Sequence, residues 1–345
     1  MINFTNTSLG DIIVHKLGNK AEDEGVHYSN NILNLQGGII EDILLKFFIS
    51  PFKSENLYRF FHDNDLNLNE VYYYVSEIFE NHENLHMQSR NLAKHLYEQS
   101  NHPKIKSGEF YVVILHDCMI EDEIFDAVGL FKTEKKDTFL KIKEQDSNYD
   151  IDYHEGININ KLDKGCLIFN TEKENGYLVS LVDNINKSKE AQYWKDDFMR
   201  IKPREDDYYH TQNYLDLCKT FVDKGIENIE KDEQAELKNE TMKYFAEKES
   251  FSAEEFEQEV IEKPEMVEAF RSYKETYEEE KEIEISDDFE IVGDAVKKAK
   301  AKFKSVIKLD KNFHIYIHGD KEFIKKGYDQ EMNKNFYQLY FDEEK

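Results

Sequence analysis

Five short runs between residues 110 and 183 constrain the fold of this chain more than any other feature. They are rich in β-branched and aromatic residues, and charged or Asn-rich turns separate them, which is typical of an antiparallel meander. The runs are Phe110–His116, Ile124–Lys132, Thr138–Lys143, Gly165–Asn170 and Gly176–Asp183. Because helical patterns precede these strands instead of alternating with them, we predict an α+β fold rather than a doubly wound parallel sheet.

The segments before the meander combine one strand pair with two helices. Asp11–Leu17 reads as a short strand that pairs with Asn30–Leu35 across a polar turn region. Ile39–Ser50 has helical apolar spacing and is ended by Pro51. The apolar residues of Glu70–Ser100 fall largely on one helical face, so we predict a single long amphipathic helix there.

Acidic residues dominate the chain after the meander. Helices are predicted at Ala191–Ile201 and Thr211–Lys224, and residues 205–290 hold 29 acidic and 10 basic residues, a net charge of −19 out of −27 for the chain. Recurring phenylalanines give these helices a buried side, so the acids form solvated outer faces. With 345 residues the chain is long enough for about two domains. We predict an α+β domain over 1–204 and an acidic helical domain over 205–345.

The charge changes sign near the C-terminus. Lys297–Lys311 carries seven lysines against one acid, Asp310, and is predicted as a helix with a positive stripe. Phe313–His318 and Asn335–Phe341 follow as predicted strands of a small terminal sheet.

Cysteine usage and the absence of targeting signals point to the cytoplasm. Cys118, Cys166 and Cys218 are odd in number and lack metal-ligand spacing, so we expect reduced thiols. The first ten residues lack a cationic start followed by an apolar run, and we expect no signal peptide. The longest apolar stretch, Ile39–Phe52, is interrupted by charges and is too short to span a bilayer.

Motifs for catalysis or cofactor binding are missing from the sequence. It has neither a phosphate-cradling Gly-rich loop nor a nucleophile elbow, so we predict no cofactor and no enzyme activity. His82 and His86 lie one helical turn apart, but no third ligand accompanies them and a structural role is favoured over a metal site. An alternative that stays open is a metal-dependent nuclease, in which Asp117, Asp126 and Lys132 would hold Mg²⁺.

Three basic clusters stand out in a chain this acidic. The first interleaves its cations with Tyr193, Trp194 and Phe198, which suits phosphate neutralisation and stacking on bases, although Trp194 and Phe198 could equally be core residues. Its predicted nucleic-acid ligands are Lys187, Lys189, Lys195, Arg200, Lys202 and Arg204. The second cluster adds Lys297, Lys298, Lys300, Lys302 and Lys304. The third lies in the meander and comprises Lys132, Lys135, Lys136, Lys141 and Lys143.

The order of these segments resembles the NdpA-type family of bacterial nucleoid-associated proteins. The similar stretches are Ile13–Leu17, FYVVILHDCMIEDEIFDAVGLFKTE at 110–134, YWKDDFMRI at 193–201 and TQNYLDLCKTFV at 211–222. The closing order of acidic helices, lysine-bearing helix and terminal strand pair also matches, so the resemblance spans nearly the whole chain. It rests on order and pattern, and no motif is specific enough to carry functional residues over one by one.

The resemblance implies a DNA-associated protein of the cytoplasmic nucleoid, without a known catalytic centre and in contact with DNA topology enzymes. The net charge of −27 opposes direct coating of DNA. We therefore keep three accounts: weak sequence-independent binding through segregated lysine surfaces, a basic protein partner docked on 205–290, or acidic helices that mimic DNA. Composition favours the last two accounts and the resemblance supports the first. Assembly into a homo-oligomer stays open.

Overall fold

The chain folds into two compact units, which we name unit 1 (Met1–Arg204) and unit 2 (Glu205–Lys345). The computed structural model describes residues 2–35, 38–52, 56–103, 105–120, 122–145, 148–184, 193–226, 229, 231–303, 305–309, 313–317, 324–341 and 343. An antiparallel sheet, many helices and small strand pairs near the C-terminus confirm the predicted α+β class. No helix within these residues is both long and apolar enough to cross a membrane.

A nine-stranded antiparallel sheet forms the centre of unit 1. Its strands are β1 (Ile2–Asn3), β2 (Ser8–Leu17), β3 (Val26–His27), β4 (Leu57–Phe60), β5 (Gly108–Ile120), β6 (Glu123–Thr133), β9 (Lys164–Phe169), β10 (Leu178–Asp183) and β11 (Ile201–Pro203). They are ordered β11-β4-β10-β9-β6-β5-β2-β3, and β1 pairs with β5. Strand β4 departs most from the chain order. Although it comes early in the sequence, it lies between β10 and β11 at one edge of the sheet.

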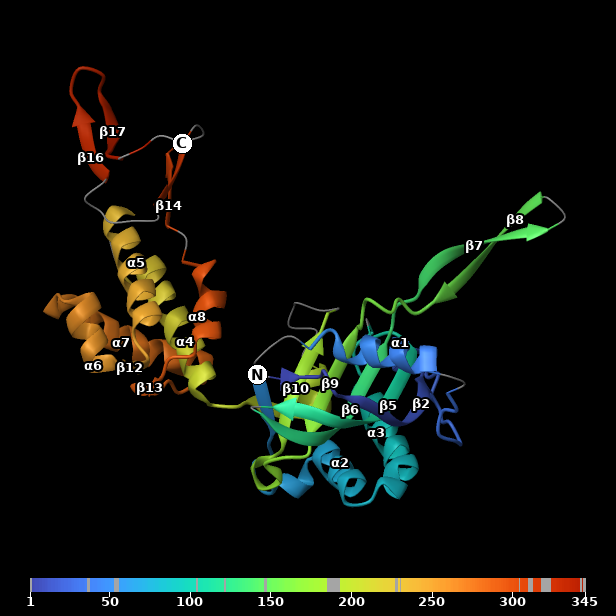
Figure 1. Ribbon diagram of the computed structural model, residues 1–345. Coiled ribbons are helices and arrows are strands. Elements are labelled where there is room, and N and C mark those ends of the chain that lie inside the picture. Colours follow the sequence, from blue (N-terminus) through green and yellow to red (C-terminus); the bar gives the residue numbers. More distant parts are fainter. Residues whose placement is uncertain are drawn as a thin grey trace. The chain divides into compact units, whose positions relative to one another are not determined.

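Helices cover both faces of this sheet (Figure 1). On one face lies α1 (Gly38–Ile49), and on the other lie α2 (Glu70–Glu80), α3 (Leu85–Gln99) and the π-helical segment η6 (Tyr193–Met199). Successive residues of a strand therefore enter different cores: Val113 packs on the α1 side and Val112 on the α2–α3 side. Burial on both faces explains the nearly continuous apolar runs of the central strands.

Two predictions for the N-terminal half are wrong in detail. On the side away from β5, β2 pairs with β3, where Lys16 pairs with His27, and the predicted strand at Asn30–Leu35 does not form. The predicted single helix over Glu70–Ser100 is two helices, because Asn81 leaves the helical region with φ −152°. Its side chain instead accepts the backbone N–H of Glu83, a local bond with which asparagine competes against helix continuation.

The predicted meander strand at Thr138–Lys143 does not join the main sheet. It belongs to a separate two-stranded sheet made by β7 (Asp137–Gln145) and β8 (Asn148–Gly156), the second of which the sequence reading missed. Single helical turns complete unit 1: η1 (Lys20–Glu22), η2 (Leu66–Leu68), η3 (His82–Asn84) and η4 (Lys173–Asn175).

Unit 2 is a helical unit around an aromatic core. Its helical segments are α4 (Asp207–Thr220), η7 (Phe221–Gly225), α5 (Lys231–Glu247), α6 (Ala253–Phe256), η8 (Glu257–Ile261), α7 (Pro264–Lys281) and α8 (Gly293–Lys300). A short pair, β12 (Ser250–Ser252) and β13 (Asp288–Glu290), ties the loop before α6 to the loop before α8. The phenylalanines that suggested a buried side do form it: Phe245, Phe251 and Phe256 are all at most 2% exposed.

The C-terminal lysine run is divided between two kinds of structure. The predicted helix over Lys297–Lys311 ends at Lys300, and β14 (Ser305–Leu309) pairs with β15 (Phe313–Ile317). A second hairpin joins β16 (Ile324–Asp329) to β17 (Lys334–Leu339). Val306 and Ile307 are β-branched residues, which favour a strand over a helix. The prediction of a helix rested on the number of lysines and overlooked them. Asp310, Lys311 and His318 lie outside the described residues.

Candidate nucleic-acid interface

Strand pairing at one edge of the unit 1 sheet gathers cations from two distant parts of the chain. The outermost strand, β11, pairs with β4, so that Lys202 lies directly opposite Arg59. We name the resulting group the β11 cationic edge. Its members are Arg59, Lys195, Arg200, Lys202 and Arg204. Arg59 was not predicted as a site residue from the sequence. The only sequence feature that points to it is its position in the short run Leu57–Phe60.

The three arginines of the edge are engaged with carboxylates. Arg200 Nη1 lies 3.4 Å from Glu70 Oε2. Glu172 receives both remaining arginines: Arg204 Nη2 lies 3.4 Å from its Oε1, and Arg59 Nη2 contacts its Oε2. Only about a third or less of the Arg59 and Arg204 side chains is exposed. The arginines therefore hold the edge together and are partly neutralised before any ligand arrives.

The two lysines of the edge lie on aromatic rings instead. Lys202 Nζ is 4.0 Å from the ring centre of Phe61, and Lys195 Nζ is 5.3 Å from that of Tyr58. No carboxylate of the described chain makes an ion pair with either lysine. Because a cation over a ring face keeps most of its N–H groups free, these two ammonium groups are the ones best able to bind phosphate.

An acidic residue beside Lys195 carries a perturbed pKa. Burial raises the pKa of the Asp196 carboxyl, with the neighbouring Asp197 adding to the rise and Lys195 opposing it. The same carboxylate, after the dominant effect of burial, helps to raise the pKa of Tyr58. The edge thus alternates positive and negative groups and has no continuous positive field.

The second predicted cluster lies on the exposed side of α8 and just after it. Ala295, Val296 and Ala299 face the core of unit 2, which leaves the lysines outside. We name Lys297, Lys298, Lys300 and Lys302 the α8 lysine stripe. Cations at the end of a helix also interact favourably with its negative C-terminal dipole.

Most members of the stripe have partners. Lys297 Nζ lies 2.7 Å from Asp294 Oδ1, and Lys302 Nζ lies 3.1 Å from Asp216 Oδ1. Lys298 Nζ donates to the hydroxyl of Tyr208 at 2.7 Å. Lys300 is exposed and has no ion-pair partner among the described residues. The remaining predicted ligands, Lys187, Lys189 and Lys304, lie outside the described residues.

The aromatic residues of η6 are core residues and cannot stack on bases. Tyr193 is 5% exposed, and Trp194 and Phe198 are completely buried. Trp194 and Phe198 pack on each other with ring centres 5.0 Å apart, within the core that contains α2 and α3. Of the two interpretations of these rings, the structural one is correct.

The other constellations suggested by the sequence are not assembled. Asp126 is hydrogen-bonded to His116 Nδ1 at 3.2 Å, whereas Lys132 lies six residues further along β6, about 20 Å away in a strand. Lys132 is 1% exposed and paired with Glu134, so it cannot share a metal with Asp126. His82 lies in η3 and not on the helix of His86. In the described ranges no group of three or more His, Cys, Asp or Glu is placed to hold a metal.

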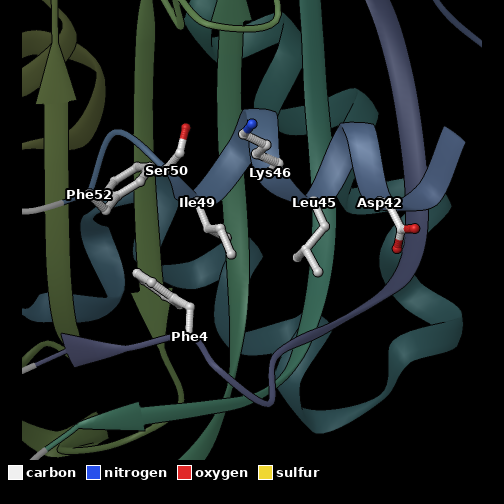
Figure 2. Close-up of a pocket in the computed structure, with 7 residues that line it drawn as sticks. All are labelled: Phe4, Asp42, Leu45, Lys46, Ile49, Ser50 and Phe52. Atoms are coloured by element: carbon white, nitrogen blue, oxygen red, sulfur yellow. The ribbon is translucent and has the colours of Figure 1, made fainter. Parts of the chain in front are cut away.

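A shallow apolar pocket lies between α1 and the segment after β1. It has a volume of about 410 Å³, and Leu45 and Ile49 point from α1 toward Phe4 (Figure 2). Among the described residues that line it, the charged ones are Asp42 and Lys46. With one acid and one cation at its rim, the pocket offers apolar contact but no phosphate-binding chemistry.

A larger polar cleft of about 550 Å³ lies in unit 2. It is bordered by six acidic side chains against two basic ones: Glu254, Glu257, Glu275, Glu278, Asp287 and Asp288 against Arg271 and Lys274. Arg271 pairs with Glu257, and Lys274 Nζ lies 3.9 Å from Glu278. The excess of carboxylates repels nucleic acid and favours cationic ligands.

His15 is a buried neutral base and predicts acid sensitivity of unit 1. Its Nδ1 accepts the backbone N–H of Ser29 at 3.1 Å, so Nε2 carries the proton and donates to Ser89 Oγ at 3.0 Å. Burial, with smaller contributions from Arg90 and His86, lowers the pKa of His15 to about 4.

Unit 1 is therefore expected to lose stability as the pH falls from 6.5 toward 4. In this window the unfolded chain binds a proton at His15 that the folded chain excludes. The free energy of unfolding therefore falls by up to about 1.4 kcal/mol for each pH unit. Urea unfolding at several pH values should show a shallower loss in His15→Gln than in the wild type. His27→Gln, which changes an exposed histidine, should leave the slope unchanged. Equal slopes in the wild type and His15→Gln would refute the prediction.

Comparison with known proteins identifies a family. A family model described as nucleoid-associated protein YejK matches residues 13–336. No curated protein matches the chain.

Proposed function

Because the chain belongs to the family of the nucleoid-associated protein YejK, we propose that it binds DNA weakly and without sequence preference, and that it acts without catalysis. The contacts are assigned to the β11 cationic edge and the α8 lysine stripe. The observation that carries the proposal is the pairing of β4 with β11, which adds Arg59 to four cations singled out by their local sequence. Association with the nucleoid follows from the family, and the phosphate contacts are our proposal.

Lys195 and Lys202 are the principal phosphate ligands of unit 1 in this proposal. Neither is tied to a described carboxylate, and both are held in place by aromatic faces. The arginines contribute secondarily, because each is already paired with a carboxylate that a phosphate oxygen would have to replace.

The geometry supports low affinity and low specificity. Phosphate contacts position a protein on DNA but carry no sequence information. The edge strand β11 has three residues, too short to lie along a groove and read bases. A net charge of −27 adds a repulsive background that few cations must overcome.

Charge reversal at the edge should weaken DNA binding. We expect Lys195→Glu/Lys202→Glu to weaken binding to a duplex at low salt by about 10-fold or more, with a shallower salt dependence because phosphate contacts are lost. Fluorescence anisotropy with a labelled duplex measures both quantities. Lys297→Glu/Lys300→Glu tests the α8 lysine stripe in the same way.

The matched control is Lys16→Glu/Lys94→Glu, which changes the net charge of unit 1 by the same amount at exposed positions away from β11. If this control weakens binding as much as the edge variant, the effect is one of net charge and the assigned edge is wrong. If the wild type binds neither duplex nor single strand at low salt, direct binding is wrong.

The polar cleft of unit 2 favours a second candidate, in which the acidic unit binds a basic protein or mimics DNA toward a DNA-processing enzyme such as a topology enzyme. Six carboxylates around one cleft suit a cationic surface. Affinity capture from lysate before and after nuclease digestion separates the candidates. Partners that disappear with the nucleic acid support direct DNA binding, whereas partners that persist support the acidic unit as the docking site.

A nuclease remains the weakest alternative. Asp117, Asp126 and Lys132 do not converge on one point of β5 and β6. A plasmid-nicking assay with Mg²⁺ or Mn²⁺ tests it, and cleavage that depends on Asp126 would overturn a non-catalytic role.

A further inference from the structure

The polar cleft of unit 2 combines buried aromatic rings with exposed charged groups. Its buried lining residues include Tyr214 of α4 and Phe270 of α7, which are 1% and 2% exposed. Its exposed lining residues come from α6, from β13 and from α7. Ser252, which precedes α6, pairs with Asp288 of β13 and so holds two of these elements together. The volume of about 550 Å³ lies in the range of small-molecule sites.

The two cations of the lining are already engaged with carboxylates of the same cleft. Arg271 Nε lies 2.8 Å from Glu257 Oε1, and its Nη2 lies 2.5 Å from Glu257 Oε2. Lys274 Nζ lies 2.5 Å from Asp287 Oδ1 and 3.9 Å from Glu278 Oε1. These internal pairs fix the positions of three acids and leave the other three acids of the lining for a ligand.

Glu254, Glu275 and Asp288 border the cleft without an ion-pair partner in the described part of unit 2. All three are exposed, and they belong to α6, α7 and β13. Among the described residues, no three His, Cys, Asp or Glu side chains come close enough to hold a metal ion. The carboxylates are therefore too dispersed to share one small ion, and they suit a cation whose charges are spread along its length.

The hydroxyl of Tyr214 is a second feature that points to a ligand. It lines the cleft and has no hydrogen-bond partner within the described ranges of the chain. Burial raises the pKa of Tyr214, and Cys218, Asp287 and Glu257 add to the rise. The last two acids border the cleft, so the hydroxyl lies within their field and stays protonated. A buried hydroxyl without a partner is costly, and a donor from a ligand removes that cost.

We propose that the cleft binds a linear polyammonium ion, an alkyl chain that carries several ammonium groups. Glu254, Glu275 and Asp288 accept charge-assisted hydrogen bonds from separate ammonium groups. The Tyr214 oxygen accepts an N–H from the group that enters deepest, and the Phe270 ring packs against the chain, as aromatic rings do with organic cations. The lining has an excess of four acidic side chains over basic ones, which the four charges of a tetraamine balance.

This inference does not rest on the DNA contacts proposed above. It concerns the same cleft as the second candidate function, in which a basic protein would present lysine side chains with the same alkylammonium chemistry. The depth of Tyr214 favours the free ion, because a slender unbranched chain reaches a hydroxyl that is 1% exposed more readily than a folded protein surface does.

Isothermal titration calorimetry of the full chain with the tetraamine spermine at low salt tests the proposal. We expect one saturable site per chain, and an affinity that falls from spermine to 1,4-diaminobutane and to n-butylamine as ammonium groups are removed. Glu275→Gln/Asp288→Asn should weaken spermine binding by about 10-fold or more, because two charge-assisted hydrogen bonds are lost. The matched control, Glu265→Gln/Glu280→Gln, removes two exposed charges of α7 that do not border the cleft and should change the affinity far less.

A second substitution tests the deep end of the cleft without changing its charge. Tyr214→Phe keeps the ring and should weaken spermine binding by about 5-fold, as expected for one lost hydrogen bond. Tyr273→Phe removes the hydroxyl of a half-buried tyrosine of α7 outside the cleft and should leave binding unchanged. An equal effect of the two tyrosine variants, with circular dichroism unchanged in both, would contradict the placement of the ligand at Tyr214.

Three further results would overturn the proposal. The first is a wild type that does not bind spermine. The second is complete displacement of spermine by Mg²⁺ at the same concentration of charge, which would show a diffuse attraction instead of an extended site. The third is a tetralysine peptide that binds more tightly than spermine and depends equally on Glu275 and Asp288. That result would assign the cleft to lysine side chains of a protein partner and support the second candidate function.

Discussion

Replacing Tyr214 with alanine is expected to unfold unit 2 and leave unit 1 folded. Tyr214 is 1% exposed and its ring is surrounded by others, the nearest being Phe251 with ring centres 4.1 Å apart. Phe245, Phe256, Phe270 and Phe289 lie within 6.2 Å by the same measure. Removing a buried aromatic ring costs about 3–5 kcal/mol, a large part of the stability of a small domain.

The two units can be followed separately in one experiment. Trp194 is the single tryptophan and is buried in the core of unit 1, so its fluorescence reports that unit alone. Far-ultraviolet circular dichroism follows the helices of both units. In Tyr214→Ala the dichroism transition in urea should gain an early phase, while the Trp194 transition should not move.

Tyr214→Phe is the matched control, because it keeps the ring and removes only the hydroxyl. We expect a change below about 1 kcal/mol. A Trp194 transition that shifts along with the early dichroism phase would contradict separate cores, and an unaffected unit 2 in Tyr214→Ala would contradict the central role of this ring.

Replacing Lys132 with methionine is expected to destabilise unit 1 by about 3–5 kcal/mol, because breaking a buried ion pair leaves the other charge uncompensated. Lys132 and Glu134 are 1% and 4% exposed, and Lys132 Nζ lies 2.9 Å from Glu134 Oε1. The same ammonium group donates to the carbonyl of Lys106 at 3.1 Å. Burial lowers the pKa of Lys132, and the Glu134 carboxylate opposes that shift. The Trp194 transition in urea measures the effect.

A second substitution distinguishes lost charge from lost packing. Lys132→Met/Glu134→Gln removes both charges and keeps an acceptor for the Tyr193 hydroxyl, which lies 3.2 Å from Glu134 Oε1. We expect it to recover at least half of the loss. Lys94→Met, at the exposed pair with Glu98, should change the stability by less than about 0.5 kcal/mol. If the double variant is as unstable as Lys132→Met, the charge explanation is wrong.

Local sequence patterns predicted those strands and helices that depend on residues close together in the chain. The runs at Phe110–His116 and Ile124–Lys132 are strands because a β-branched, aromatic stretch is buried whichever face it presents. The helix at Ile39–Ser50 ends before Pro51, whose ring cannot continue it. The prediction of one long helix over Glu70–Ser100 is wrong at Asn81. There a single hydrogen bond between the asparagine side chain and the backbone outweighs the apolar periodicity.

The sequence predicted only part of the candidate interface. Arg200, Lys202 and Arg204 lie in one run, and their positive charge is evident without a structure. Arg59 joins them through the pairing of β4 with β11. The acids that neutralise the arginines also come from elsewhere, Glu70 from the start of α2 and Glu172 from the turn after β9.

The sequence alone determined the α+β class, the concentration of acids after residue 204 and the presence of lysine clusters, because composition and periodicity act within a few residues of each other. Tertiary structure decided which cations meet carboxylates, that the η6 aromatics are buried, and that the β7–β8 hairpin leaves the main sheet. Those outcomes depend on contacts between segments far apart in the chain, and no local pattern encodes which of many compatible partners a strand or a charge will find.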